Sequence, residues 1–427
     1  MSEPSYSTGD EGVLRGNKPI KVVAMEVAAT QLAGFLYMSG YKVYFCGGYV
    51  RDKVIGVKPK DIDIVTSATP DQIKEVLIKA RLTPIPVGES FGVIRVNFGG
   101  YDFEIATLRK EDSYSDGRRP DSVSFTDNLK EDAQRRDLTM NAMYYDPFRQ
   151  PKSVSMYDNP DSGIIDFFGG ENDAKNGIIR AVGDPYKRFA EDYLRMLRVV
   201  RFACRFDKCS IDPDTSAAVF ANAQGLKNIS KERIITEFDG IIKSANPDRG
   251  LRMLRWMGLL GFISEQANGL PNDKFDRMCQ LDKDCRHLPP AHRIAAFMIE
   301  FTPHGNTQIG NVVDFCERKL TSVIGAKPQP VAGIIERLRT MLFYVQSMDI
   351  VDKYKILGNP YIYDDLKFLK AYESLSNTSG KYSELSGDFR YFTESMPETR
   401  KLNAPALVTG DMLKELGFKP GPELAKV

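Results

Sequence analysis

Residues 47–70 read GGYVRDKVIGVKPKDIDIVTSATP, and this stretch decides the fold that we expect for the N-terminal part of the chain. A short β-rich run at 42–46 ends at the glycine pair, which opens a predicted helix over 49–55. A second strand is predicted at 61–65. The segment 69–72, TPDQ, then begins a helix, because Thr suits the N-cap, Pro the first helical position and Gln the third. This alternation of strands and helices indicates a mixed α/β domain.

Outside this stretch, the sequence continues the mixed pattern to about residue 168 and then changes character. Residues 21–38 predict an amphipathic helix. Residues 93–98 and 101–107 flank Gly99-Gly100 and predict a hairpin-like pair of strands. From 190 to the end helical periodicity dominates, so we expect a small α/β domain followed by a long helical region.

Asp61 and Asp63 stand two residues apart in the predicted second strand, so their side chains project together while Ile62 and Ile64 face the core. Two neighbouring carboxylates repel each other unless a cation lies between them. Hard oxygen ligands suit Mg²⁺, which binds through one or two protein carboxylates and substrate phosphates. Glu104, on the polar side of the second hairpin strand, is a third candidate oxygen ligand. The sequence therefore predicts a magnesium site.

The glycine pair before the predicted helix fits a triphosphate. Gly47 and Gly48 let backbone amides approach phosphates closely at a helix start, and Arg51 adds a fixed positive charge. The alternative is a solvent-exposed Asp-x-Asp strand after an unrelated glycine turn. The two motifs at this spacing favour a nucleotide site over that alternative.

The stretch 47–70 resembles the first motif of class II nucleotidyltransferases, which comprise CCA-adding enzymes and bacterial poly(A) polymerases. The resemblance implies a polymerase β-like head, made of a small mixed sheet with helices, followed by an all-α neck, body and tail. The expected division is a disordered lead-in at 1–20, a catalytic head at 21–168, a neck at 169–245, a body at 246–345 and a tRNA-binding tail at 346–427.

Two further motifs resemble those of this family. The segment 132–141, DAQRRDLTMN, resembles its RRDxxxN motif, which implies ribose and triphosphate binding by Arg135, Arg136, Asp137 and Asn141. As bare sequence, this segment equally suits a helix terminus with ordinary ion pairs.

The segment 191–205, EDYLRMLRVVRFACR, resembles the EDxxR pattern. As one continuous helix it places Asp192 and Arg195 on one face. The resemblance implies that these two side chains read the Watson–Crick edge of CTP or ATP. On spacing alone, an ordinary surface salt bridge is the better interpretation.

Residues 108–126 form a polar loop with positive charge near the predicted active strand. The resemblance implies a flexible loop that takes part in the switch from C to A addition, with Arg109, Asp116 and Arg118 as its candidate residues. Gly169-Gly170 resembles the hinge between head and neck. Residues 407–427 resemble the tail segment of CCA-adding enzymes.

The family resemblance implies template-independent addition of CCA to the 3′ end of tRNA, with two Mg²⁺ ions as cofactors. The expected partners are tRNA, CTP and ATP, with neither DNA nor a membrane; the oligomeric state stays open. Three alternatives also stay open: a poly(A) polymerase, a tRNA nucleotidyltransferase that adds only A, and a catalytically inactive RNA-binding module. Residues 87–92, VGESFG, and the tail segment favour CCA addition over poly(A) synthesis.

Composition sets broad limits on the location and chemistry of the protein. The 427 residues carry a formal net charge of +1, which neither predicts nor excludes a nucleic-acid partner. Six scattered cysteines are too few for a disulfide framework and fit a reducing cytoplasm. Cys279, Cys285, His287 and His292 lack the spacing of structural zinc sites. No apolar run reaches the roughly 20 residues that a membrane span needs.

Overall fold

The computed structural model describes residues 20–88, 92–111, 123–149, 163–300 and 361–376, together with scattered positions between 333 and 390. The chain divides into two units. The first unit comprises the residues up to 199 together with 208–228, and the second comprises 200–207 and the residues from 229 onward.

A seven-stranded mixed sheet forms the frame of the first unit, in the order β3-β4-β5-β2-β1-β8-β9. Its strands are β1 Val43–Cys46, β2 Asp63–Thr66, β3 Ile85–Gly88, β4 Val93–Phe98, β5 Tyr101–Thr107, β8 Met143–Tyr145 and β9 Ile164–Asp166. β2 runs parallel to β5, and all other neighbours in this sheet are antiparallel. This sheet and its helices confirm the predicted mixed α/β fold.

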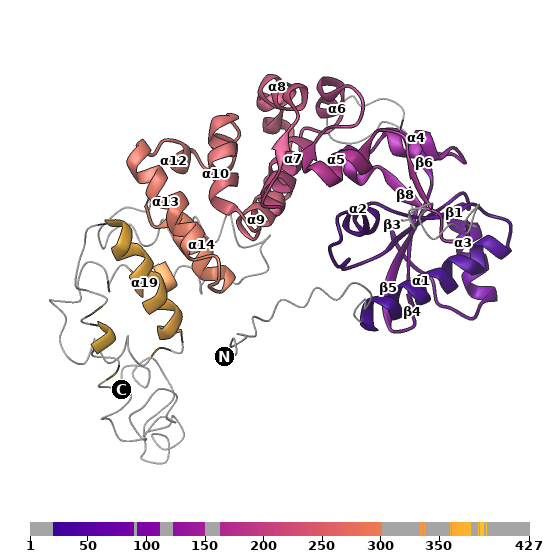
Figure 1. Cartoon of the computed structure of the whole chain (residues 1–427), viewed down its shortest axis with the longest axis horizontal. Helices are drawn as coiled ribbons and strands as arrows, with labels where there is room; N and C mark the ends of the chain where they lie inside the picture. The colour runs from indigo at the N-terminus through magenta and orange to yellow at the C-terminus, as the bar shows by residue number, and fades with distance from the viewer. Residues whose placement is uncertain are drawn as a thin grey trace, which may run out of the picture. The chain divides into compact units, whose positions relative to one another are not determined.

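Two helices, α1 Ile20–Met38 and α3 Pro70–Lys79, pack against the strands of this sheet (Figure 1). α3 begins as the sequence predicts, because the Thr69 side chain accepts from the amide of Gln72 and the Gln72 side chain accepts in return. The predicted helix at 21–38 is confirmed as α1, with one buried face that includes Leu32 and Leu36, but its opposite face is less polar than the prediction of an amphipathic helix implies. Its outward positions include Val27, 51% exposed, and Met38, 84% exposed, in place of charged residues.

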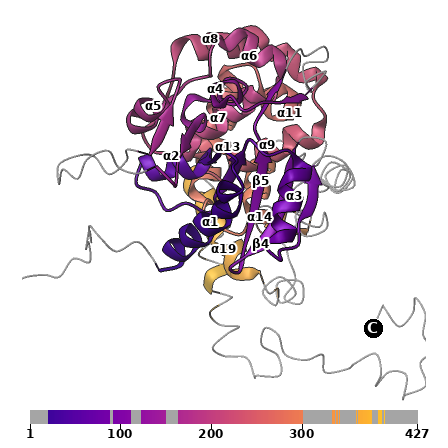
Figure 2. The same cartoon turned by 90° about the vertical axis from the view of Figure 1, so that its right-hand side faces the viewer.

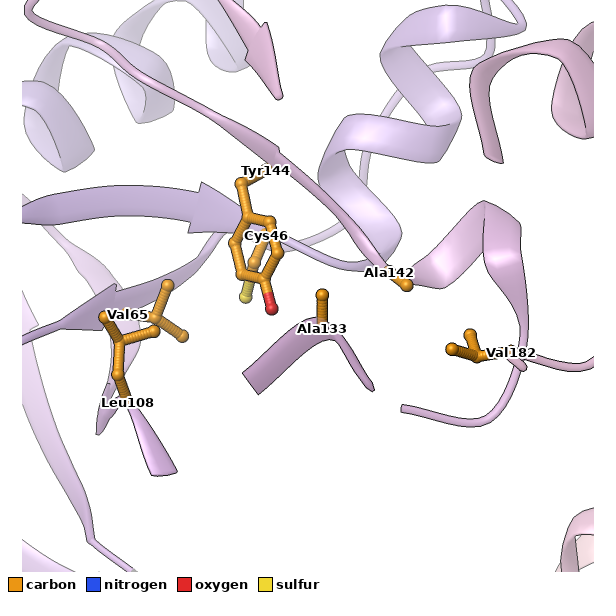
Figure 3. Close-up of a cluster of buried hydrophobic side chains, with 7 residues drawn as sticks. All are labelled: Cys46, Val65, Leu108, Ala133, Ala142, Tyr144 and Val182. Carbon is orange, nitrogen blue, oxygen red and sulfur yellow. The ribbon is translucent and has the colours of Figure 1, made fainter. Parts of the chain in front are cut away.

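A cluster of buried side chains lies on the face of the sheet that carries Val65 (Figure 3). Cys46 and Tyr144 contribute from β1 and β8, and Ala133 contributes from the helix α4 Leu129–Gln134. Because strand residues two apart point to the same face, Asp63 lies on the face of Val65, at the edge of this cluster. The cluster therefore supports the strand end that carries the predicted carboxylates.

The remaining elements of the first unit follow in chain order. They are α2 Gly48–Val54, β6 Arg109–Glu111, β7 Val123–Phe125, the 3₁₀ helix η2 Thr139–Asn141, α5 Gly170–Asn176, β10 Ile178–Ile179, α6 Pro185–Glu191, α7 Arg195–Arg205, β11 Ser210–Ile211, α8 Pro213–Asn222 and η3 Ala223–Asn228. The last residues of α7 belong to the second unit.

The prediction of one continuous helix over 191–205 is wrong. α6 ends at Glu191, Asp192 is extended with φ −147° and ψ 103°, and α7 begins at Arg195. The Asp192 carboxylate accepts a hydrogen bond from the amide of Leu194 at 3.1 Å. An aspartate that bonds its own following backbone competes with helix formation, which accounts for the break.

The second unit is helical where the structure describes it, in agreement with the predicted helical region. Its helices are α9 Lys231–Ile242, α10 Pro247–Trp256, α11 Leu260–Ile263, α12 Glu265–Asn268, α13 Asn272–Asp284, α14 Pro290–Met298 and α19 Ile362–Ser376. α19 packs against α13 and α14, as Figure 1 shows from the side, and Figure 2 gives the view turned by 90°. Among the described residues, no helix is long and apolar enough to cross a membrane.

Several predictions fall on residues outside the described ranges. They are the lead-in before residue 20, most of the 108–126 loop, the centre of the VGESFG segment and the tail segment at 407–427. The division into head, neck, body and tail stays a prediction.

Candidate active site

The predicted carboxylates meet at the start of β2. Asp61 precedes the strand and Asp63 opens it, and both side chains are exposed, whereas Ile62 and Ile64 are buried as predicted. β2 and β5 pair Ile64 with Ile105, so Glu104 lies one position before this pair and on the face of Asp63. Glu104 accepts a hydrogen bond from Arg95 at 3.0 Å.

The charge state of Asp63 reflects this crowding. Desolvation by the surrounding protein, followed by the negative charges of Asp61 and Glu104, raises the pKa of the Asp63 carboxyl to about 6, although Arg136 opposes the shift. The side chain stays open to solvent, so a ligand can reach it. Exposed, mutually repelling carboxylates with hard oxygen donors suit a divalent cation.

The residues present fit a magnesium ion that is shared between protein and substrate. Among the residues that the structure describes, no three His, Cys, Asp or Glu side chains form a complete metal-binding group. Mg²⁺ usually binds through one or two carboxylates and completes its coordination with water and phosphate oxygens. Asp61 and Asp63 provide such a partial ligand set.

Gly47 lies between opposite charges at the junction of β1 and α2. Its φ of +66° places it in a conformation that glycine adopts readily. A Cβ on this residue would lie 3.5 Å from Nη1 of Arg136 and 3.9 Å from Oδ2 of Asp63. Gly47 thus leaves open the space between the carboxylates and the arginine. Gly48 is the first residue of α2.

Arg51 lies in α2, and its exposed fraction is only 3%. Its Nε and Nη2 donate to Asp52, and its Nη1 donates to Oδ1 of Asn141 at 2.7 Å. The sequence predicts a charge that faces the triphosphate. In the structure Arg51 orients Asn141, which donates onward to Asp137 at 3.3 Å, and a contact of Arg51 with the triphosphate stays a prediction.

Asp132 connects the two adjacent arginines, Arg135 and Arg136. It was not among the predicted site residues. Its carboxylate is fully buried and accepts from Arg135 at 2.7 Å, from Arg136 at 3.1 Å and from the Tyr144 hydroxyl at 2.7 Å. Burial alone would raise the pKa of Asp132, but Arg136 and Arg135 outweigh it and lower the pKa to about 2. Its spacing of three and four residues before two arginines was the signal available in the sequence.

Asp137 lies at the start of the RRDxxxN turn and contacts the first residues of α7. Its carboxylate accepts from Nε of Arg198 at 2.7 Å and from the amide of Leu138 at 2.8 Å. Burial alone would raise the pKa of Asp137, but the Arg198 charge and the hydrogen bonds that Asp137 accepts lower it to about 2. Arg198 had no predicted role. The i+3 spacing from Arg195 placed it on the same face of α7, which was the signal available.

The predicted base-selecting residues lie at the break between α6 and α7. Arg195 is 8% exposed and donates to the backbone oxygens of Arg188 and Arg135, each at 3.0 Å, and to the Glu191 carboxylate. Glu191 also accepts from Arg188 at 2.6 Å, so one carboxylate holds two arginines. Arg195 is thereby joined directly to the RRDxxxN segment.

The base of the predicted flexible loop is tied to the same network. The amide of Arg109, in β6, donates to Asp132 at 3.3 Å, and its carbonyl accepts from Nε of Arg135 at 3.2 Å. β6 and β7 pair antiparallel on either side of the loop. Asp116 and Arg118 lie outside the described residues, so their predicted role stays a prediction.

Two family models match parts of this chain. A family model described as "Poly A polymerase head domain" matches residues 43–180, and one described as "Probable RNA and SrmB-binding site of polymerase A" matches residues 209–269. The first match contains the carboxylates, the glycine pair and the RRDxxxN turn. Membership of this nucleotidyltransferase family implies the use of a metal ion.

The individual relatives that match this chain are described as CCA-adding enzymes. A CCA-adding enzyme of Ligilactobacillus salivarius is 42% identical over 215 residues, which cover 50% of this chain and 48% of that protein. The chain thus spans about half the length of the first curated relatives that it matches. A CCA-adding enzyme of Streptococcus sanguinis is 31% identical over 391 residues, 91% of this chain and 88% of that protein.

A solved structure extends the similarity to nearly the whole chain. The CCA-adding enzyme of Bacillus stearothermophilus in complex with CTP matches with a TM-score of 0.68 and 25% identity, covering 96% of this chain and 91% of that one. These matches confirm the predicted fold class, an α/β N-terminal part followed by a mostly helical region. With the alignment to the streptococcal enzyme, they show that the chain belongs to the CCA-adding enzyme family.

Proposed function

We propose that this protein adds CCA to the 3′ end of tRNA from CTP and ATP, without a nucleic-acid template and with release of pyrophosphate. The observation that carries the proposal is the meeting of Asp63, Gly47 and Arg136 at the junction of β1, β2 and α2. A carboxylate, an open backbone and a guanidinium there provide separate contacts for a metal and a triphosphate. The alignment over 391 residues with a CCA-adding enzyme supports the same activity.

Asp61 and Asp63 are the proposed holders of Mg²⁺, with two ions expected and Glu104 as a further catalytic carboxylate. When bound, the metal supplies Lewis acidity that activates the 3′-hydroxyl of tRNA and offsets charge at the α-phosphate. Asp61 and Asp63 are both exposed to solvent, which leaves room for substrate oxygens beside them. Transfer joins the 3′-oxygen to the α-phosphorus, and the bond from that phosphorus to the pyrophosphate breaks.

The RRDxxxN turn is the proposed ribose and triphosphate site. Arg135 and Arg136 would contact phosphate oxygens while Asp132 keeps both guanidinium groups in place. Asp137 and Asn141 would face the ribose. Their mutual hydrogen bond supports a preformed site, which costs less to order when the nucleotide binds.

Asp192 and Arg195 are the proposed readers of the base. A guanidinium fork and a carboxylate can present donors and an acceptor to the edges of cytosine and adenine. The contacts of Arg195 with Glu191 and with the Arg135 backbone support this role, because they fix the direction of the fork. The solved relative that binds CTP supports CTP as a substrate.

The tRNA is the proposed macromolecular partner, held mainly by contacts to phosphates and to helix shape. We extend the proposal to the division into head, neck, body and tail over 21–168, 169–245, 246–345 and 346–427. A cytoplasmic location is also proposed. Among the described residues, the five cysteines are buried and form no disulfide with one another, which suits a reducing compartment.

The test is incorporation at single-nucleotide resolution. Purified protein is incubated with Mg²⁺ and tRNA transcripts that end at the discriminator base, at C or at CC, and each labelled nucleotide is supplied singly and together. Growth that stops after CCA supports the proposal. Incorporation only onto the CC end identifies an A-adding enzyme, a long A tail on any RNA identifies a poly(A) polymerase, and no incorporation identifies an inactive RNA-binding module.

A further inference from the structure

The turn that carries Asp137 and Asn141 has little regular structure of its own. η2 spans only Thr139–Asn141, yet Thr139 is 1% exposed and Asn141 7% exposed. A short 3₁₀ turn provides few internal hydrogen bonds, so neighbouring segments must fix its position. The contacts that do so identify residues on which the proposed nucleotide site depends.

The backbone of residues 180–182 holds one side of this turn. The amide of Thr139 donates to the Arg180 carbonyl at 2.9 Å, and the amide of Val182 donates to the Asp137 carbonyl at 3.1 Å. Leu138 and Ala181 form an antiparallel bridge between these bonds. The turn is therefore paired with the strand-like segment that follows α5.

The Arg180 side chain connects that segment to two helices. Its Nε donates to Oδ2 of Asp173 in α5 at 3.0 Å, and its Nη1 donates to Oδ1 of Asp212 at the N-cap of α8. The same Oδ2 of Asp173 accepts from the Thr139 hydroxyl at 2.7 Å. One carboxylate thus joins Arg180 directly to the turn.

Asp212 completes the connection on the other side. Its Oδ2 accepts from the amide and the hydroxyl of Thr215, each at 3.0 Å. The Thr215 hydroxyl in turn accepts from the amide of Ala181 at 3.1 Å. The carboxylates of Asp173 and Asp212 are 5% and 10% exposed, so water competes weakly for these bonds.

The two helices lead to different parts of the proposed nucleotide site. α5 contacts η2, and α8 packs against α6, which ends at Glu191 beside Asp192. Resting on the proposed function, we infer that Arg180 is a positioning residue. It sets the ribose-binding turn at a fixed distance from the base-reading residues by bridging Asp173 and Asp212.

Three variants test this inference. Arg180→Met removes both ion pairs and keeps much of the side-chain length. Arg180→Lys keeps the charge, but a single ammonium cannot reproduce the planar fork that reaches two carboxylates. Lys175→Met is the matched control, because Lys175 forms an ion pair with Glu171 within α5 and neither residue belongs to the turn.

The measurements are KM and kcat for CTP, the ratio of CTP to UTP incorporation, CTP binding by equilibrium dialysis, and the melting temperature. Arg180→Met is expected to raise KM and the CTP dissociation constant about tenfold and to lower the CTP preference, because a displaced substrate loses orientation. Arg180→Lys is expected to be intermediate, and Lys175→Met to behave as wild type.

A lower melting temperature with unchanged KM, CTP binding and base preference would overturn the inference, because that pattern describes a purely structural ion pair. Equal effects of Arg180→Met and Lys175→Met would also overturn it. If Arg180→Met does not fold, Arg180→Lys decides by the same criteria. Failure of the wild type to incorporate any nucleotide would refute the proposed function instead, which separates the two outcomes.

Discussion

Replacing Asp132 with Asn tests the buried network beneath the proposed nucleotide site. The change removes one negative charge and preserves the shape of the side chain. The charges of Arg136 and Arg135 lower the pKa of Asp132 from an ordinary 3.8 to about 2. At 1.36 kcal/mol for each pKa unit, this difference corresponds to a stabilisation of about 2 kcal/mol at neutral pH. Because the substitution also leaves two guanidinium groups without their carboxylate, the total loss approaches about 3–5 kcal/mol.

The assay is urea unfolding followed by circular dichroism at several pH values, with Asp127→Asn as the control. Asp127 also pairs with a basic residue, Lys42, but its side chain is 77% exposed, so its replacement is expected to change the unfolding free energy by less than about 0.5 kcal/mol. The contribution of Asp132 is expected to be complete above about pH 5. This contribution is lost as the pH falls from the ordinary pKa of 3.8 toward the folded pKa of about 2.

Two results would refute the reasoning. One is a loss of less than about 1 kcal/mol for Asp132→Asn at pH 7, comparable with a surface substitution. The other is a difference between wild type and variant that grows as the pH is lowered from 7 to 4. Either result would mean that Asp132 does not hold Arg135 and Arg136 through its charge.

Two further predictions concern packing and buried charge. Asp282 is fully buried in α13, and neither carboxylate oxygen has a hydrogen-bond partner among the described residues. Burial raises the pKa of Asp282 to about 7, although the Arg293 charge opposes the rise and the Asp248 charge adds to it. Wild type is therefore expected to lose stability as the pH rises toward 7. In thermal unfolding, the unfolding free energy of Asp282→Asn relative to wild type is expected to rise by about 2–3 kcal/mol from pH 5 to pH 8. A difference between the two proteins that stays constant over this pH range would contradict the prediction. Gly170→Ala places a Cβ 2.1 Å from the Thr139 carbonyl oxygen, so it is expected to lower the unfolding free energy by at least about 1–3 kcal/mol. In the control Gly34→Ala, in α1, the added Cβ meets nothing within 4 Å, so this change is expected to stabilise the protein by about 0.5–1 kcal/mol. Similar melting temperatures for these two glycine variants would count against the close packing of α5 on η2.

Local signals predicted much of the first unit. The start of α3 depends on bonds between Thr69 and Gln72, and the β4–β5 turn depends on two adjacent glycines with positive φ. Both signals lie within a few residues of the feature that they determine. The strand order was not predictable in this way, because β2 pairs with β5 about forty residues further on.

The site shows the same distinction between local and long-range information. The two carboxylates were found because a period of two places them on one side of a strand. Arg51 was expected to face the substrate, and its hydrogen bond with Asn141, 90 residues away, had no signal in the local sequence. The α6–α7 break was missed because Asp192 lies in a sequence without Gly or Pro. Tyr193, which packs against Gly225 beside this break, gives no sequence signal for it.

The central claim is that Asp61 and Asp63 support magnesium-dependent CCA addition. The most direct measurement follows C and A incorporation into tRNA that ends at the discriminator base, over a titration of Mg²⁺, for wild type and for Asp61→Asn, Asp63→Asn and Asp71→Asn. Asp71 is an exposed aspartate that pairs with Lys74 in α3 and serves as the control.

The account predicts that wild type and Asp71→Asn stop after CCA. It predicts that the two site variants lose incorporation by about a thousandfold at every Mg²⁺ concentration while they stay folded. Complete CCA addition by Asp63→Asn at the Mg²⁺ concentration that supports the wild type would contradict it.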